Sequence, residues 1–213
     1  MLKVGTMFGY IKDKEINYWN NYYKPKSKRF PNSDFSEFAL DKIERMSSLI
    51  DIGCGDGRDS YFFSENKIAT KGIDFSPEAI NENKKHSNHF LSYECLDLQN
   101  INEINATFDY AYCRFIFHSI NEKVESTLLK WLSKNISKSI FIETRVLDKE
   151  NIIENTNHYR RFFSESDFII KIKEHNFKID YSESSYNFSK YKKIYKVKDL
   201  TLDPLILRLI ISK

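Results

Sequence analysis

A glycine-rich segment at residues 51–59, DIGCGDGRD, has the residue types of a nucleotide-binding loop. The apolar residues 49–52 are typical of a buried strand, and the residues after Arg58 are typical of a helix. Alternate glycines between them let the backbone turn sharply and leave room for a ligand. Asp74 ends the next apolar run, at the distance from Gly53 at which an acid binds ribose hydroxyls. This spacing predicts a nucleotide site.

Two common phosphate-binding loops do not fit these residues. A dinucleotide-binding loop needs a glycine three residues after its second glycine, and this chain has Arg58 there. A P-loop needs Gly-Lys followed by Ser or Thr, and the segment has no such sequence. Asp51 before the glycines and Arg58 after them suit a ligand with an amino-acid tail, since an acid binds the amine and an arginine binds the carboxylate. S-adenosylmethionine has such a tail beside a ribose.

Four segments resemble, in order, the motifs of class I S-adenosylmethionine-dependent methyltransferases. They are residues 51–60, 72–76 (GIDFS), 95–98 (CLDL) and 108–115 (FDYAYCRF). The resemblance implies a Rossmann-like fold, with S-adenosylmethionine as cofactor and S-adenosylhomocysteine as product. The expected cofactor-binding residues are Trp19, Asp51, Gly53, Cys54, Gly55, Arg58, Asp74, Phe75, Ser76, Asp97, Leu98 and Cys113.

Three of these residues also have a structural explanation. Phe75 would lie against the adenine or cover the edge of the sheet. Asp97 would accept a hydrogen bond from the adenine amino group or cap a helix. Arg58 would bind the cofactor or lie on a helix surface.

Apolar segments alternate with amphipathic ones in the pattern of an α/β protein. The expected strands are 49–52, 68–73, 90–95, 108–113, 138–143, 177–186 and 205–211. The expected helices are 14–23, 33 to about 46, 58–65, one from 76, 101–105, 121–134 and 164–175. This order predicts a seven-stranded, mostly parallel sheet with an antiparallel last strand and helices on both faces. We expect one structural domain, with residues 1–46 as a helical cap and 47–213 as the cofactor-binding part.

Basic and aromatic residues follow the later strands, where ligands bind in such sheets. Arginine forks suit phosphate and carboxylate oxygens, so the acceptor is expected to be a small anion. The expected substrate-binding residues are Tyr18, Tyr22, Tyr23, Arg145, Tyr159, Arg160 and Arg161. Alternatives remain open, because Arg145 could instead pair with Glu143 or Glu154, and residues 160–161 could form a solvated surface.

The expected catalytic residues are His118, His158 and Arg114. A hydroxyl acceptor needs a base, and histidine, whose ordinary pKa lies near neutrality, suits that role at either position. An acceptor that is already anionic needs only to be positioned by the arginines. Alignment of the acceptor with the S–CH₃ bond can contribute about 7–11 kcal/mol of the barrier.

A finer resemblance covers nearly the whole chain after residue 14, including residues 18–23 (YWNNYY) and 31–35 (PNSDF). Residues 112–120 (YCRFIFHSI), 141–145 (FIETR), 158–162 (HYRRF) and 203–208 (DPLILR) resemble one class I subgroup. That subgroup belongs to bacterial surface-polysaccharide gene clusters and includes enzymes tied to capsule phosphoramidate or phosphorylated sugars. It implies an O-methylation of such a precursor. The chain departs from the subgroup at residues 146–157, where an expected glycine-containing loop is missing.

Composition agrees with this interpretation. The net charge of +3 indicates neither a nucleic-acid nor a membrane partner. No apolar run approaches the roughly 20 residues of a membrane span. The three cysteines lack metal-site spacing, so we expect no metal and a reducing, cytoplasmic location. An RNA or protein methyltransferase and a non-catalytic cofactor-binding subunit remain alternatives, and the sequence leaves monomer or homodimer open.

Overall fold

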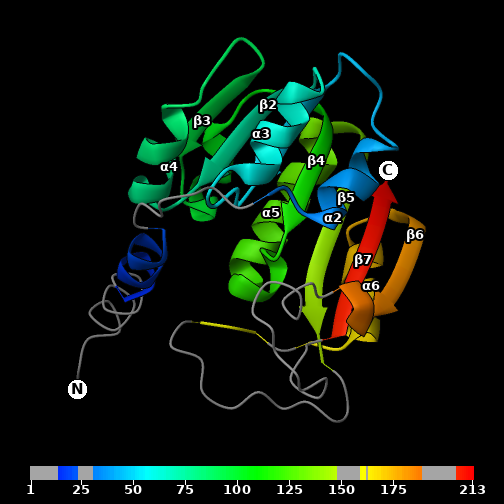
Figure 1. The fold of residues 1–213 in the computed structure, drawn as a ribbon. Helices are drawn as coiled ribbons and strands as arrows, with labels where there is room; N and C mark the ends of the chain where they lie inside the picture. The colour runs from blue at the N-terminus through cyan, green and yellow to red at the C-terminus, as the bar shows by residue number, and fades with distance from the viewer. Residues whose placement is uncertain (1–13, 24–30, 148–158, 162, 189–204) are drawn as a thin grey trace, which may run out of the picture.

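The computed structural model describes residues 14–23, 31–147, 159–161, 163–188 and 205–213 (Figure 1). Its centre is a seven-stranded sheet with the order β3-β2-β1-β4-β5-β7-β6. The strands are β1 Ser48–Ile52, β2 Ala69–Asp74, β3 Leu91–Cys95, β4 Phe108–Arg114, β5 Ile136–Val146, β6 Lys178–Ser185 and β7 Leu205–Ser212. The first five pair in parallel, and β7 runs antiparallel to β5 and β6. The predicted fold is confirmed.

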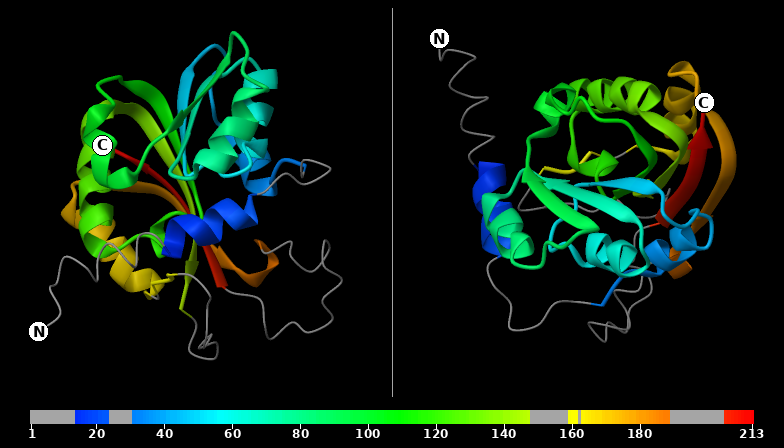
Figure 2. Two further views of the ribbon diagram at one scale, coloured as in Figure 1. Left: turned by 90° about the vertical axis from the view of Figure 1, so that its left-hand side faces the viewer. Right: turned by 90° about the horizontal axis from the view of Figure 1, so that it is seen from above.

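Helices cover both faces of this sheet. The α-helices are α2 Asp34–Leu40, α3 Arg58–Glu65, α4 Pro77–Lys84, α5 Glu122–Asn135 and α6 Glu165–Glu174. Short 3-10 helices are η1 Leu98–Glu103, η2 Phe117–Ser119 and η3 Tyr186–Phe188. Figure 2 shows α2 and α3 on one face, with α5 and α6 on the other. A further helix, over residues 14–22, lies beside α4 at the carboxyl ends of the parallel strands.

Alternate residues of each strand supply the two halves of the core. On β1, Ile50 and Ile52 pack in the cluster that includes Leu128 of α5. Leu49, which points the other way, packs with Phe35 of α2 and Phe63 of α3. The sheet is therefore buried on both faces, as parallel sheets generally are.

Two predicted helices differ in the structure. The second helix ends at Leu40 rather than near Met46, which has a φ of 61°. Of the residues between them only Ile43 is buried, so a longer helix would bury little more apolar surface. The helix expected at 101–105 is the 3-10 helix η1, which begins earlier because the Asp97 side chain accepts a hydrogen bond from Gln99 N.

We predict that Gly72→Ala destabilises the fold. A Cβ at position 72 would come within 2.6 Å of Cδ1 in the buried Tyr93 ring and 3.0 Å of Ser60 Oγ. Such overpacking costs about 1–3 kcal/mol. The midpoint of urea unfolding measures the change. Ala69→Ser, at the exposed start of the same strand, is the control and is expected to shift stability by at most about 0.5 kcal/mol. Equal midpoints for the two variants would contradict the prediction.

Candidate functional site

The loop between β1 and α3 depends on glycine. Gly53, Gly55 and Gly57 all have left-handed backbone, with φ values of 73°, 54° and 70°. Residues with a side chain adopt this conformation at a cost of about 1–2 kcal/mol each. The amides of Gly53 and Cys54 both donate to the Ile73 carbonyl, at 2.8 and 2.9 Å. The loop therefore turns away from β1 while it stays attached to the end of β2.

Side chains from β2 and α4 fix the middle of this loop. Asp74 Oδ2 accepts a hydrogen bond from the Gly55 amide at 3.0 Å, and its Oδ1 accepts one from the Ser76 amide at 2.9 Å. Asn83 Nδ2 donates to the Gly55 carbonyl at 2.7 Å. Asp74, which the sequence analysis expects to bind the ribose, therefore also holds the glycine loop in place.

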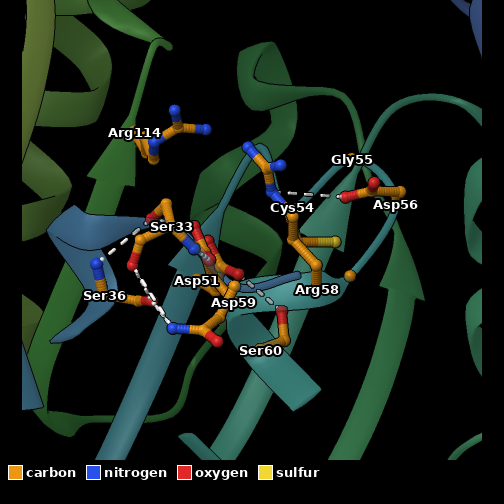
Figure 3. Close-up of polar contacts among 12 residues, drawn as sticks. Ser33, Ser36, Asp51, Cys54, Gly55, Asp56, Arg58, Asp59, Ser60 and Arg114 are labelled. Atoms are coloured by element: carbon orange, nitrogen blue, oxygen red, sulfur yellow. Dashed lines mark hydrogen bonds and ion pairs between the residues drawn. The ribbon is translucent and has the colours of Figure 1, made fainter. Parts of the chain in front are cut away.

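A buried polar junction joins α2, α3 and β4 behind the loop. Asp59 accepts hydrogen bonds from the Ser33 amide at 2.7 Å, the Ser33 hydroxyl at 2.8 Å and the Tyr112 hydroxyl at 3.0 Å. Figure 3 shows Ser33 and Asp59 close together beside the loop. Ser33 also caps α2. This junction fixes the start of α2 against the sheet.

A cavity of about 1110 Å³ opens at the carboxyl ends of the parallel strands. The half of the cavity that lies at the ends of β1, β2 and β3 is lined by acidic residues at the strand ends. Asp51 lies in β1, Asp74 ends β2 and Asp97 follows β3, and all three line the cavity. Burial raises the pKa of Asp51 to about 8, although its hydrogen bond from Ser60 opposes this shift. Burial also raises the pKa of Asp74 to about 6, against the lowering effect of its amide donors.

The other half of the cavity is basic at the strand ends. Arg114 ends β4, Arg145 lies near the end of β5, and Arg208 lies in β7. The buried Glu143 joins two of them, because it accepts hydrogen bonds from Arg114 Nε at 2.9 Å and from Arg208 Nε at 2.7 Å. Arg160 also lines the cavity, as do two acids of α2, Asp34 and Glu37. The lining is thus divided by charge along the edge of the sheet.

The helix over residues 14–22 contributes aromatic lining. It supplies Tyr18, Trp19 and Tyr22, and Tyr23 follows it. The Trp19 and Tyr23 rings are stacked, with centroids 5.9 Å apart. The Tyr23 hydroxyl lies 2.4 Å from the position that a Cβ on Gly55 would occupy. Burial and the nearby carboxylates raise the pKa of Tyr23 well above its ordinary value.

Two hydrogen bonds attach this helix to opposite sides of the cavity. Asn20 Oδ1 accepts from Ser76 Oγ at 2.6 Å, at the start of α4. Glu15 Oε1 accepts from the Tyr159 amide at 2.7 Å, in the segment after β5. The aromatic residues are therefore held across both halves of the lining.

Most of the predicted site residues line this one cavity. They are Tyr18, Trp19, Tyr22, Tyr23, Asp51, Gly53, Cys54, Gly55, Arg58, Asp74, Phe75, Asp97, Leu98, Arg114, His118, Arg145, Tyr159 and Arg160. Their roles toward a ligand stay predictions. His158 lies outside the described residues.

The structure corrects three predicted residues that lie behind the cavity wall. Cys113 is fully buried in the core against α5. Ser76 is buried too, and its hydroxyl caps α4 by accepting from the Ala79 amide. Arg161 forms an ion pair with the buried Glu125 of α5, and its amide donates to the His118 carbonyl at 2.8 Å. These contacts hold Arg161 outside the cavity lining, so it does not belong to the acceptor site.

The hydrogen bonds of His118 define the tautomer of its neutral ring. Its Nδ1 lies 3.2 Å from Thr144 Oγ1 and accepts a long hydrogen bond, 3.4 Å, from the Arg145 amide. A backbone amide can only donate, so a neutral ring in this position carries its proton on Nε2. In that tautomer Nδ1 is already engaged, and the role of His118 toward a ligand stays a prediction.

The lining also includes residues to which the sequence analysis gave no role of their own, among them Glu143, Arg208 and Phe115. Arg208 is the one charged residue in the apolar run 205–211, which marked it as unusual. Its partner Glu143 could not be identified without knowing that β7 pairs with β5. Phe115 has a φ of 58°, which is rare for a bulky side chain. Its ring lies 4.4 Å from Arg114 Cζ and 5.6 Å from Arg145 Cζ. Nothing in the sequence indicated this backbone conformation.

Comparisons with known proteins give a family and a fold. A family model described as a methyltransferase domain matches residues 50–134. No curated protein matches the chain. Among solved structures, a 1,6-didemethyltoxoflavin-N1-methyltransferase from Burkholderia thailandensis is 17% identical with a TM-score of 0.67, over 84% of this chain and 76% of that one.

Two other solved structures align over more of the chain. Magnesium protoporphyrin IX methyltransferase from Synechocystis PCC 6803 is 11% identical with a TM-score of 0.62, over 94% of this chain and 84% of that one. The cyclase SpnF is 13% identical with a TM-score of 0.68, over 99% and 94%. At these identities the structures establish the fold, and the family match on the segment with the glycine loop adds the activity. The fold is that of class I methyltransferases, and the activity is S-adenosylmethionine-dependent methyl transfer.

The lining of this methyltransferase fits its cofactor. S-adenosylmethionine carries a sulfonium and an ammonium, and the acidic half of the cavity offers it three carboxylates. The glycine loop would hold the amino-acid tail, and Asp74 the ribose. Within the described residues, no group of three or more His, Cys, Asp or Glu side chains is arranged to hold a metal. None of the helices described is long and apolar enough to span a membrane.

We predict that cofactor binding to this methyltransferase releases protons near pH 7. With a pKa of about 8, Asp51 is mostly protonated in the free protein. A cationic ligand beside it favours the carboxylate and lowers that pKa, so the proton leaves. Calorimetric titration in two buffers with different ionisation enthalpies measures the release, which is at most about one proton for this group.

Asp51→Asn, which keeps an acceptor for Ser60, is expected to remove most of that release. The free protein gives a second test. The folded state holds the Asp51 proton more tightly than the unfolded chain does, so the contribution of Asp51 to stability falls as the pH rises from about 4 to about 8. This slope is expected to be shallower in the variant. Binding enthalpies of the wild type that are independent of the buffer would contradict the assignment.

Proposed function

We propose that this methyltransferase acts on a small anionic acceptor. The observation that carries the proposal is the division of charge along the carboxyl edge of the sheet. Carboxylates at the ends of β1 and β2 and after β3 suit the cationic cofactor, and arginines on β4, β5 and β7 suit an anion. A neutral or cationic acceptor would leave Glu143 as the one carboxylate shared by the Arg114 and Arg208 guanidinium groups in the described part of the chain.

The side chains of the basic half would position the acceptor. When bound, the cofactor supplies an activated methyl group on its sulfonium. The guanidinium groups of Arg114 and Arg145 both lie close to the Phe115 ring, and both arginines line the cavity. His118 lines the same part of the cavity. Alignment of this kind can contribute about 7–11 kcal/mol of the barrier.

The cavity favours a small acceptor over RNA or a protein. The helix over residues 14–22 is attached on both sides of the opening, at Asn20 and at Glu15. Such a covered site suits a molecule that enters it whole. The absence of nucleic-acid and membrane partners, the oligomeric state and the cytoplasmic location stay predictions.

The finer proposal is an O-methylation in the synthesis of a capsule or other surface-polysaccharide precursor that bears a phosphoramidate or a phosphorylated sugar. The resemblance of residues 112–120 and 141–145 to that subgroup supports it. Arginines in the acceptor half agree with a phosphorylated acceptor, because guanidinium forks match phosphate oxygens.

We predict that Asp74→Ala lowers the affinity for S-adenosylhomocysteine by about tenfold or more, which corresponds to about 1.4 kcal/mol. The variant loses the expected ribose acceptor and also the carboxylate that holds the Gly55 amide. Calorimetric titration measures the affinity. Glu65→Ala, which removes an exposed acid from the end of α3, is the matched control and should bind as the wild type does.

Transfer of a labelled methyl group to a panel of acceptors tests the proposal itself. The panel pairs phosphorylated and carboxylated sugars with their neutral parents and includes RNA. We expect label in the charged members and little in their neutral parents. Methylation of the neutral parents alone, or of RNA alone, would refute the anionic acceptor and leave the cofactor assignment intact.

A further inference from the structure

A row of charged residues crosses the sheet beside the cavity. Arg114 on β4 is the register partner of Glu143 on β5, and Glu143 is the register partner of Arg208 on β7. The Glu143 carboxylate is 1% exposed and accepts one hydrogen bond from each arginine. Two guanidinium groups thus share one carboxylate, so the row has a net positive charge.

Arg208 is the more enclosed of the two arginines. It is 7% exposed, and its Cζ lies 4.0 Å from the centre of the Phe188 ring and 5.2 Å from that of Phe35. The side chains of Phe188 and Phe35 line the cavity together with it. The rings and Glu143 fix the plane of the guanidinium, so little side-chain entropy remains to be lost when a ligand binds.

The hydrogen bonds of Arg208 within the described residues leave the donors on its two Nη atoms for a ligand. Within the described part of the chain, its one side-chain hydrogen bond runs from Nε to Glu143. Glu183 is its register partner on β6, but that carboxylate accepts from the Tyr181 hydroxyl. A buried guanidinium is costly unless all its donors are satisfied, and an oxyanion satisfies the paired Nη donors in two-point contact.

We propose that Arg208 is the anion-binding residue of the acceptor site and that Glu143 is its positioning residue. The ligand class is a phosphate or carboxylate group carried by a small molecule, bound beside Phe188 with Arg114 on the far side of Glu143. The proposal rests on the proposed function, and it assigns the charge recognition of the acceptor to β7, a strand from which sequence analysis drew no site residue.

The experiment titrates inorganic phosphate and, separately, acetate into the protein saturated with S-adenosylhomocysteine, at constant ionic strength. Bound S-adenosylhomocysteine fills the cofactor half of the cavity. The added anion therefore cannot bind where the carboxylate of the cofactor's amino-acid tail binds. We expect Arg208→Gln to weaken binding of the preferred anion about tenfold or more. Its affinity for S-adenosylhomocysteine should stay within about twofold of the wild type. A preference for phosphate or for acetate identifies the group on the natural acceptor.

Two further variants keep the test decisive. Arg45→Gln removes an exposed arginine outside the cavity and should leave anion binding unchanged. Arg208→Lys keeps the charge beside Glu143 but loses the fork, so it should fold and still bind the anion more weakly than the wild type. If Arg208→Gln does not fold, the anion affinity of Arg208→Lys tests the proposal in its place.

Unchanged anion binding in the Arg208 variants, or no binding of either anion by the wild type, would overturn the proposal. Failure of the wild type to bind S-adenosylhomocysteine would instead count against the cofactor assignment. The anion titration is then repeated on the free protein, so the two failures remain distinguishable.

Discussion

The backbone of the glycine loop is the constraint on which the rest of the site depends. Its three left-handed residues let the chain leave β1, meet the end of β2 and enter α3 within a few residues. No side chain projects from Gly53 or Gly55 to close the cavity floor. Asp74 and Asn83 fix this floor through backbone groups of Gly55 alone. The cofactor half is therefore shaped by main-chain geometry before any ligand arrives.

The order of the strands converts this floor into a two-sided site. β1 lies between β2, which continues the acidic half, and β4, which begins the basic half. The strand order reverses at this point, so the loops diverge and leave space between the two charges. Carboxylates whose pKa values are raised by burial face arginines across that space. A cationic cofactor and an anionic acceptor would each bind in the half of opposite charge and would attract one another.

The sequence predicted features that depend on local pattern. Apolar runs located the strands, and the spacing of Gly53, Asp74 and Asp97 located the acidic half. The missed features depend on packing between distant segments. Arg160 and Arg161 are adjacent in sequence, yet only the first lines the cavity, because Glu125 of a distant helix binds the second. Likewise, Arg208 meets Glu143 only through the insertion of β7 between β5 and β6.

That insertion also links the acceptor site to the order of folding. β6 pairs with β7 and not with β5, so the outer edge of the sheet cannot assemble until β7 has docked. Before then the Glu143 carboxylate has Arg114 as its one guanidinium partner on the neighbouring strands. Docking of β7 therefore adds the second guanidinium group to Glu143 and brings Arg208 to the cavity in the same event. A ligand on Arg208 would stabilise the docked strand, so occupancy of the active site would slow the unfolding of that edge of the protein.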